Sequence, residues 1–182
     1  IGQTQEVTFG DDFAGTGFYY ATGHFGQTLP SIPRSTLVRN WVSRLTEAIH
    51  QHDTNHLITV GMIAGVRQFS TNNLYDLIDF SGIHLYPNSS LEDPVAALRK
   101  EVLFHRAFGI PVIMEEHWPT AGGETSIQFL DWSRPANGEH SLSGWISFYW
   151  GQTYEEGLNS TSLMDFVRAT WLKMFVDWHS QW

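Results

Sequence analysis

Short apolar runs of strand-forming residues alternate with longer segments of helical period along most of this 182-residue chain. After a short strand at the N-terminus, the apolar runs predict strands at 56–61, 82–86, 111–116 and 145–150. The segments between and after them predict helices at about 35–50, 74–78, 91–108, 125–132 and 162–178. Such alternation is typical of βαβ units and a parallel sheet. We therefore expect an α/β fold in a single domain that spans residues 1–182.

The first and last predicted helices each carry an apolar face, spaced as expected for a helix that covers a core. In the first, apolar residues recur every four positions with two valines beside them, namely Leu37, Trp41, Leu45 and Ile49 with Val38 and Val42. In the last, one face holds Leu163, Val167, Trp171, Met174 and Trp178, of which we assign the two tryptophans to the core. Ser162 and Asp165 resemble a capping box at the start of this last helix. Gly109 is suited to end the helix predicted at 91–108.

Charge and composition exclude several classes of function. Ten Lys and Arg face nineteen Asp and Glu, a net charge of −9, which argues against nucleic-acid binding and against anionic membrane surfaces. No apolar run approaches the roughly 20 residues that cross a bilayer. Cysteine is absent, so there is no disulfide framework and no thiolate metal site. Without a phosphate-binding glycine motif or a zinc motif, we expect neither a cofactor nor a metal. Cysteine usage leaves the compartment undetermined, and an exported or extracellular location is the favoured one of the open alternatives.

Polar side chains stand at the carboxyl ends of the predicted strands, where functional residues of parallel α/β folds gather. His84 and Tyr86 share one face of their strand because alternate residues point the same way. By the same parity Glu116 ends the strand that starts near Pro111, and Glu115 is its outward neighbour. Trp150 ends the last strand. The sequence thus predicts a His, a Tyr, a carboxylate and a Trp at one rim of the sheet.

This set of side chains suits sugar chemistry. Retaining glycoside hydrolysis uses two carboxyl groups about 5–5.5 Å apart, one as nucleophile and one as acid and base. A tyrosine hydroxyl can hold the nucleophile ionised and oriented, because a hydrogen bond to a carboxylate favours its charged form. The eight tryptophans exceed what one core of this size needs, so some of them are expected to form a surface that stacks on sugar rings.

Three segments resemble strands six, seven and eight of clan A glycoside hydrolases, and most resemble glycoside hydrolase family 5, the cellulase and mannanase type. They are the segments 79–87, 110–118 and 144–150, while 34–61 is similar to helix four and strand five of the same barrels. The resemblance implies a (β/α)₈ barrel, a retaining mechanism and no cofactor. The chain would supply about strands four to eight, the C-terminal part of such a barrel.

The resemblance also assigns residues. Pro111 followed five residues later by Glu116 matches the nucleophile of strand seven, and His84 and Tyr86 match the His-x-Tyr of strand six. No Asn-Glu pair occurs, so the resemblance leaves Gln5-Glu6 as the counterpart of strand four. Glu6 would then be the acid and base, with Gln5 in place of the Asn that contacts the sugar 2-hydroxyl. The remaining residues expected to bind substrate are aromatic or imidazole side chains: Trp150, Trp118 and His117.

Length leaves alternatives open. A (β/α)₈ barrel takes about 250 residues, and strands one to three have no counterpart here. A missing N-terminal segment is the favoured explanation, a second chain could complete the barrel, and an open sheet is the third possibility. For function, the alternative is a non-catalytic, carbohydrate-binding remnant of a glycosidase barrel.

Overall fold

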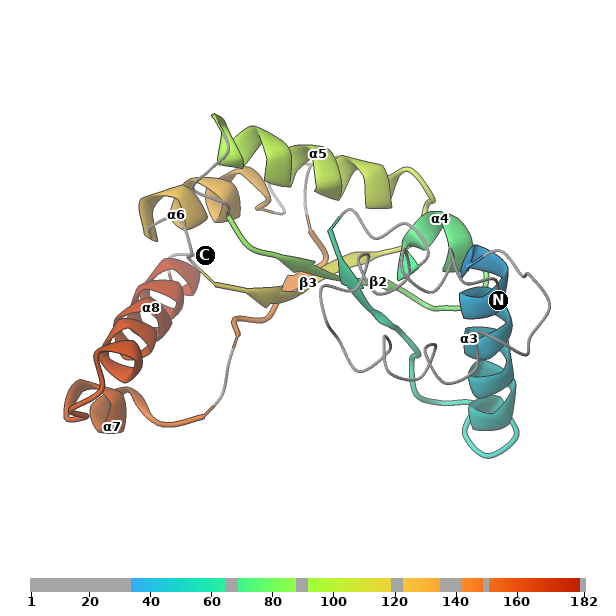
Figure 1. Cartoon of the computed structure of the whole chain (residues 1–182), viewed down its shortest axis with the longest axis horizontal. Helices are drawn as coiled ribbons and strands as arrows, with labels where there is room; N and C mark the ends of the chain where they lie inside the picture. The colour runs from blue at the N-terminus through green and yellow to red at the C-terminus, as the bar shows by residue number, and fades with distance from the viewer. Residues whose placement is uncertain are drawn as a thin grey trace, which may run out of the picture. The chain divides into compact units, whose positions relative to one another are not determined.

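The computed structural model describes residues 34–64, 69–87, 92–118, 123–134, 142–148 and 151–180 (Figure 1). These residues form a mixed α/β fold with helices and a four-stranded parallel sheet, whose strand order is β1-β2-β3-β4. The chain divides into two compact units, Ile1–Ser81 and Gly82–Trp182. The predicted α/β class is confirmed, whereas the eightfold barrel and the single domain stay predictions.

In the first unit, helix α3 (Arg34–His50) confirms the predicted first helix, but its buried face is shifted by one residue. Val38, Val42 and Thr46 are buried, and the Thr46 hydroxyl donates to the carbonyl of Val42 at 3.0 Å. The predicted row is wrong in part, because Trp41 and Leu45 are 44% and 45% exposed. Positions 38, 42 and 46 also follow the i, i+4 spacing, so apolar spacing alone did not separate the two rows.

The strand predicted at 56–61 is wrong, because strand β1 covers only Gly61–Ile63. The backbone amide of Ile58 donates to the Asp79 carboxylate at 2.7 Å, and the Asp79 amide donates back to the Ile58 carbonyl at 2.9 Å. A side-chain acceptor here takes the amide that a strand ladder would use. Helix α4 (Thr71–Leu74) likewise lies earlier than the predicted helix at 74–78.

The strands that carry the candidate site were predicted more closely. Strand β2 (Ser81–Leu85) and strand β3 (Val112–His117) each lie within one residue of the predicted bounds. Strand β4 (Gly144–Trp145) pairs in parallel with β3 but is only two residues long. The predicted strand over 145–150 is therefore too long, although the amides of Ile146 and Phe148 still donate to carbonyls of β3. Residues 149 and 150 lie outside the described residues.

The helices of the second unit follow their sequence signals. Helix α5 (Pro94–Arg106) begins at a proline, with the Asp93 carboxylate accepting from the Ala96 amide at 2.8 Å. The turn after it contains Gly109, whose φ of 76° is the left-handed backbone that glycine adopts freely. Helix α6 (Gly123–Trp132) confirms the helix predicted at 125–132.

Helix α7 (Tyr154–Leu158) was not predicted, although Thr153 and Glu156 form a complete capping box at its start. Helix α8 (Leu163–His179) begins at the predicted cap, where the Ser162 hydroxyl accepts from the Asp165 amide at 3.4 Å. Cap residues thus fix the start of both helices, and α7 packs against α8.

The core of the second unit lies between the sheet and helices α5, α6 and α8. Figure 1 shows α5 and α6 on one side of the strands, and α5 packs against both β3 and α6. Trp171 and Trp178 are buried as predicted, whereas Leu163, Val167 and Met174 are exposed, so that part of the predicted face is wrong. Within the described residues, no helix is long and apolar enough to cross a membrane.

Candidate active site

A tyrosine and a carboxylate meet at the carboxyl ends of β2 and β3. Tyr86 directly follows β2, and its hydroxyl donates to Oε2 of Glu116 in β3 at 2.5 Å. Burial raises the pKa of Tyr86 above its usual value, and the hydrogen bond to Glu116 and the charge of that carboxylate raise it further. Tyr86 is therefore a proton donor at neutral pH, and Glu116 is the acceptor.

His84 lies beside the same pair and contacts two carboxylates. Its Nε2 is 3.3 Å from Oε2 of Glu115, and its Nδ1 is 3.5 Å from Oε2 of Glu116. The three side chains are 20%, 33% and 31% exposed. The structure thus brings His84, Tyr86 and Glu116 together, as the sequence predicted. It corrects the expectation that Glu115 is an outward neighbour.

Burial along β3 explains this correction. Val112 and Met114 are buried, but the next fully buried side chain is His117 rather than Glu116. The alternation therefore changes phase between Glu115 and Glu116, and both carboxylates stay partly exposed within reach of His84. Strict parity places neighbouring residues on opposite faces, so a reading of the sequence by parity alone misses Glu115.

His117 was predicted to bind substrate, but the structure places it in the core with no exposed surface. Its ring lies 5.5 Å from the Phe129 ring and 5.7 Å from the Trp171 ring, measured between centroids. Nδ1 is 2.7 Å from the Leu85 carbonyl oxygen, which can only accept, so Nδ1 carries the proton. Burial lowers the pKa of His117 to about 4, which keeps the ring neutral.

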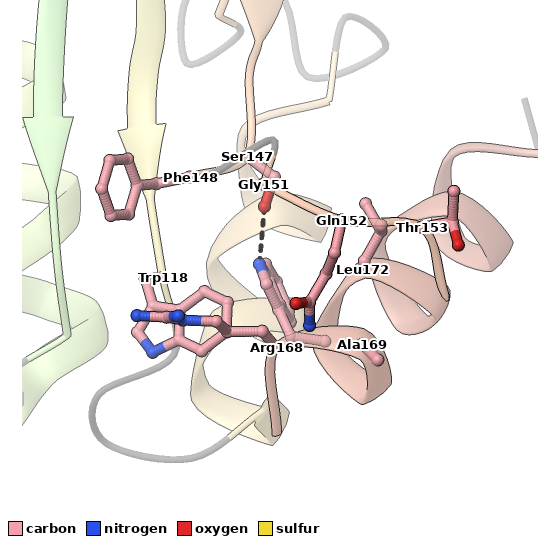
Figure 2. Close-up of a pocket in the computed structure, with 10 residues that line it drawn as sticks. Trp118, Ser147, Phe148, Gly151, Gln152, Thr153, Arg168, Ala169 and Leu172 are labelled. Carbon is pink, nitrogen blue, oxygen red and sulfur yellow. Dashed lines mark hydrogen bonds between the residues drawn. The ribbon is translucent and has the colours of Figure 1, made fainter. Parts of the chain in front are cut away.

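Aromatic side chains follow both β3 and β4. Phe148 makes an edge-to-face contact with Tyr86, with ring centroids 6.5 Å apart. Phe148 lies two residues after Ile146, so strand parity places both side chains on one face and could have identified Phe148 as a site residue. Trp118, predicted to contact sugar, follows β3 and lines a hollow of about 10 Å³ together with Phe148 and Arg168 (Figure 2). A space of this size holds about one water molecule.

The opposite side of the segment after β4 anchors it to the core. In Figure 2, Ser147 is directed toward α8, while Phe148 is directed away from it. The indole nitrogen of Trp171 donates to the Ser147 hydroxyl at 2.7 Å. Gln152, another wall of the hollow, donates to the Asp165 carbonyl at 3.4 Å. These bonds hold Phe148 where it meets Tyr86.

Three predicted site residues lie outside the described part of the chain: the acid and base Glu6, its neighbour Gln5, and the platform Trp150. In the ranges that the structure describes, no three His, Asp or Glu side chains gather in a way that could hold a metal ion. What the structure assembles is thus a carboxylate fixed by a phenol hydroxyl, a second carboxylate, an imidazole and exposed aromatic rings.

This arrangement has a definite chemical capacity. The hydrogen bond from Tyr86 holds the Glu116 carboxylate in one orientation, as a nucleophile or a general base requires. The partly exposed oxygens of Glu115 and the nitrogens of His84 offer further polar contacts to a hydroxyl-rich ligand. Comparison with protein-family models and with curated proteins finds no match for this chain.

Proposed function

We propose that this protein is a glycoside hydrolase that cleaves a β-linked polysaccharide or oligosaccharide by a retaining mechanism. The observation that carries the proposal is the Tyr86–Glu116 hydrogen bond at the carboxyl ends of two neighbouring parallel strands. Nucleophilic carboxylates of retaining glycosidases must be ionised and oriented at the anomeric carbon. A phenol donor 2.5 Å from Oε2 of Glu116 supports the second requirement, because it fixes the orientation of the carboxylate.

In the proposed reaction, the Glu116 carboxylate attacks the anomeric carbon and forms a covalent glycosyl-enzyme as the leaving oxygen departs. Glu6 protonates that oxygen, then takes a proton from the water that hydrolyses the intermediate. Two inversions at the same carbon restore its configuration. Gln5 contacts the sugar 2-hydroxyl, and His84 positions both Glu116 and the sugar.

The proposal includes the fold around the site. The four parallel strands belong to a (β/α)₈ barrel, to which this chain contributes the C-terminal part. A further N-terminal segment or a second chain supplies the remaining strands. Trp150 and Trp118 provide flat apolar faces for sugar rings, and the proposed partner is a carbohydrate, with no cofactor, metal, nucleic acid or membrane involved.

The test compares two isosteric variants of neighbouring carboxylates on β-glucan and β-mannan. We expect Glu116→Gln to lower kcat by at least about 10³-fold, because an amide can neither attack nor leave. Glu115→Gln is the matched control, since the same change is made one residue away beside the same His84. It should retain activity within about tenfold, because it keeps the Tyr86–Glu116 pair.

Equal hydrolysis by wild type and Glu116→Gln would remove Glu116 from the mechanism. Binding of the glycans by the wild type without any turnover would instead support the carbohydrate-binding remnant. Isothermal titration calorimetry with the same glycans measures this binding independently of turnover.

A further inference from the structure

His117 has an unusual setting for a residue next to a proposed nucleophile. It directly follows Glu116 in β3, yet its side chain has no exposed surface. Its Nδ1–H donates across to the carbonyl of Leu85, the residue immediately before Tyr86. The bond therefore joins β3 to β2 beside the point where Tyr86 meets Glu116.

The other ring nitrogen of His117 lowers the stability of the fold. Within the described residues, Nε2 of His117 is buried and has no hydrogen-bond partner. A buried polar atom without a partner destabilises a fold, and an apolar ring would fill the space between Phe129 and Trp171 without that cost. Of the two ring nitrogens, Nδ1 is the one that makes a hydrogen bond, and an apolar ring would not supply that donor.

The backbone of His117 also forms a hydrogen bond close to Tyr86. Its carbonyl accepts from the Phe148 amide at 3.1 Å, and the Phe148 ring packs edge-on against Tyr86. One residue of β3 is thus bonded to the main chain that precedes Tyr86 and to the residue whose ring supports Tyr86. Both contacts restrict where the Tyr86 hydroxyl can lie.

We propose that His117 is a positioning residue that, through its Nδ1–H bond to the Leu85 carbonyl, holds Tyr86 against the Glu116 carboxylate. This role rests on the proposed function for its catalytic meaning, but the bond it controls is measurable without a substrate. The neutral ring matters here, because it keeps a charge out of the core while it donates.

The test follows the hydrogen bond of the Tyr86 hydroxyl by NMR at neutral pH, in protein labelled with tyrosine carrying ¹³C at Cζ and with Tyr86→Phe to assign the signal. The Cζ chemical shift of a phenol responds to whether its hydroxyl donates to a carboxylate, and Glu116→Ala gives the reference position of the signal without that acceptor. We expect His117→Phe, which keeps an aromatic ring but removes the donor at Nδ1, to move the Tyr86 Cζ signal most of the way from its wild-type position to its position in Glu116→Ala.

Two variants separate positioning from general packing. Phe129→Leu disturbs the same core beside the His117 ring but leaves the bond to Leu85 in place, so the Tyr86 Cζ signal should stay at its wild-type position. His117→Asn has a side-chain amide that can donate in place of Nδ1–H, so it should also keep the wild-type Cζ signal. It also tests the proposal if the phenylalanine variant does not fold.

A wild-type Tyr86 Cζ signal in folded His117→Phe would overturn the proposal, as would an equal movement of that signal in Phe129→Leu or a moved signal in folded His117→Asn. If the wild type hydrolyses β-glycans, His117→Phe should lower kcat about tenfold with little change in KM. Absence of hydrolysis would count against the proposed function alone, because the Tyr86 Cζ signal decides the positioning role by itself.

Discussion

Two histidines at the ends of neighbouring strands show how differently the two sides of this sheet use the same residue type. His84 is partly exposed and lies within 3.5 Å of two carboxylates. His117 is fully buried, lies between Phe129 and Trp171, and donates to a backbone carbonyl. One side of the strand ends is therefore polar and open to a ligand, while the other is an apolar core in which His117 donates a hydrogen bond.

The contrast shows that burial, rather than residue type, decides which histidine can meet a substrate. Both were expected to bind substrate from the sequence, and only His84 is accessible to one. It also separates two kinds of contribution: side chains on the open side can contact a ligand, whereas contacts on the covered side contribute to stability. Changes on the covered side should therefore have the larger effect on unfolding.

The largest effect on stability should come from acid acting on His117. Its pKa is about 4 in the folded chain and near 6.5 when unfolded, so between these values the unfolded chain binds one more proton. Its contribution is complete above about pH 6.5 and is lost as the pH falls toward 4. We expect the free energy of unfolding to fall by about 3 kcal/mol over this range, measured by urea denaturation.

His117→Phe gives the control for this pH dependence. The phenylalanine variant has no proton to bind at this position, so its stability should vary less with pH between 6.5 and 4. If the free energy of unfolding changes with pH equally in variant and wild type, other groups cause the acid sensitivity. The contrast drawn between His84 and His117 would then not hold.

A smaller effect should follow from Ser147→Ala on the covered side. The change removes the acceptor of the buried Trp171 indole and leaves its N–H without that partner. We expect a loss of about 1–2 kcal/mol in the free energy of unfolding by the same measurement. Ser143→Ala, at an exposed position just before β4, is the matched control and should stay within about 0.5 kcal/mol. Equal losses in both variants would contradict a specific role for the Trp171 bond.

Predictions from the sequence were most accurate where a local pattern is compatible with only one kind of secondary structure. Alternation and a run of strand-forming residues placed β2 and β3 within one residue, and cap residues placed the start of α8. The strand at 56–61 failed because a distant carboxylate, Asp79, captures an amide that local patterns assign to a ladder. Tertiary contacts of this kind leave no trace in a short window of sequence.

The candidate site was predictable to the same extent. Parity and strand ends brought His84, Tyr86 and Glu116 together, and the structure adds the distances between them. The nearness of Glu115 to His84 and the burial of His117 were missed because the alternation along β3 changes phase near its end. Side-chain packing against α6 and α8 decides that phase, and the sequence of β3 alone does not contain it.

The central claim, that Glu116 is the nucleophile of a retaining glycosidase, is tested most directly by trapping its covalent intermediate. Incubation with a 2-deoxy-2-fluoro β-glycoside that has a good leaving group should add one sugar per chain, and mass spectrometry of the digested protein should locate it on Glu116. A sugar on Glu115 or on any other residue, or hydrolysis of a β-glycan with inverted configuration, would contradict the claim.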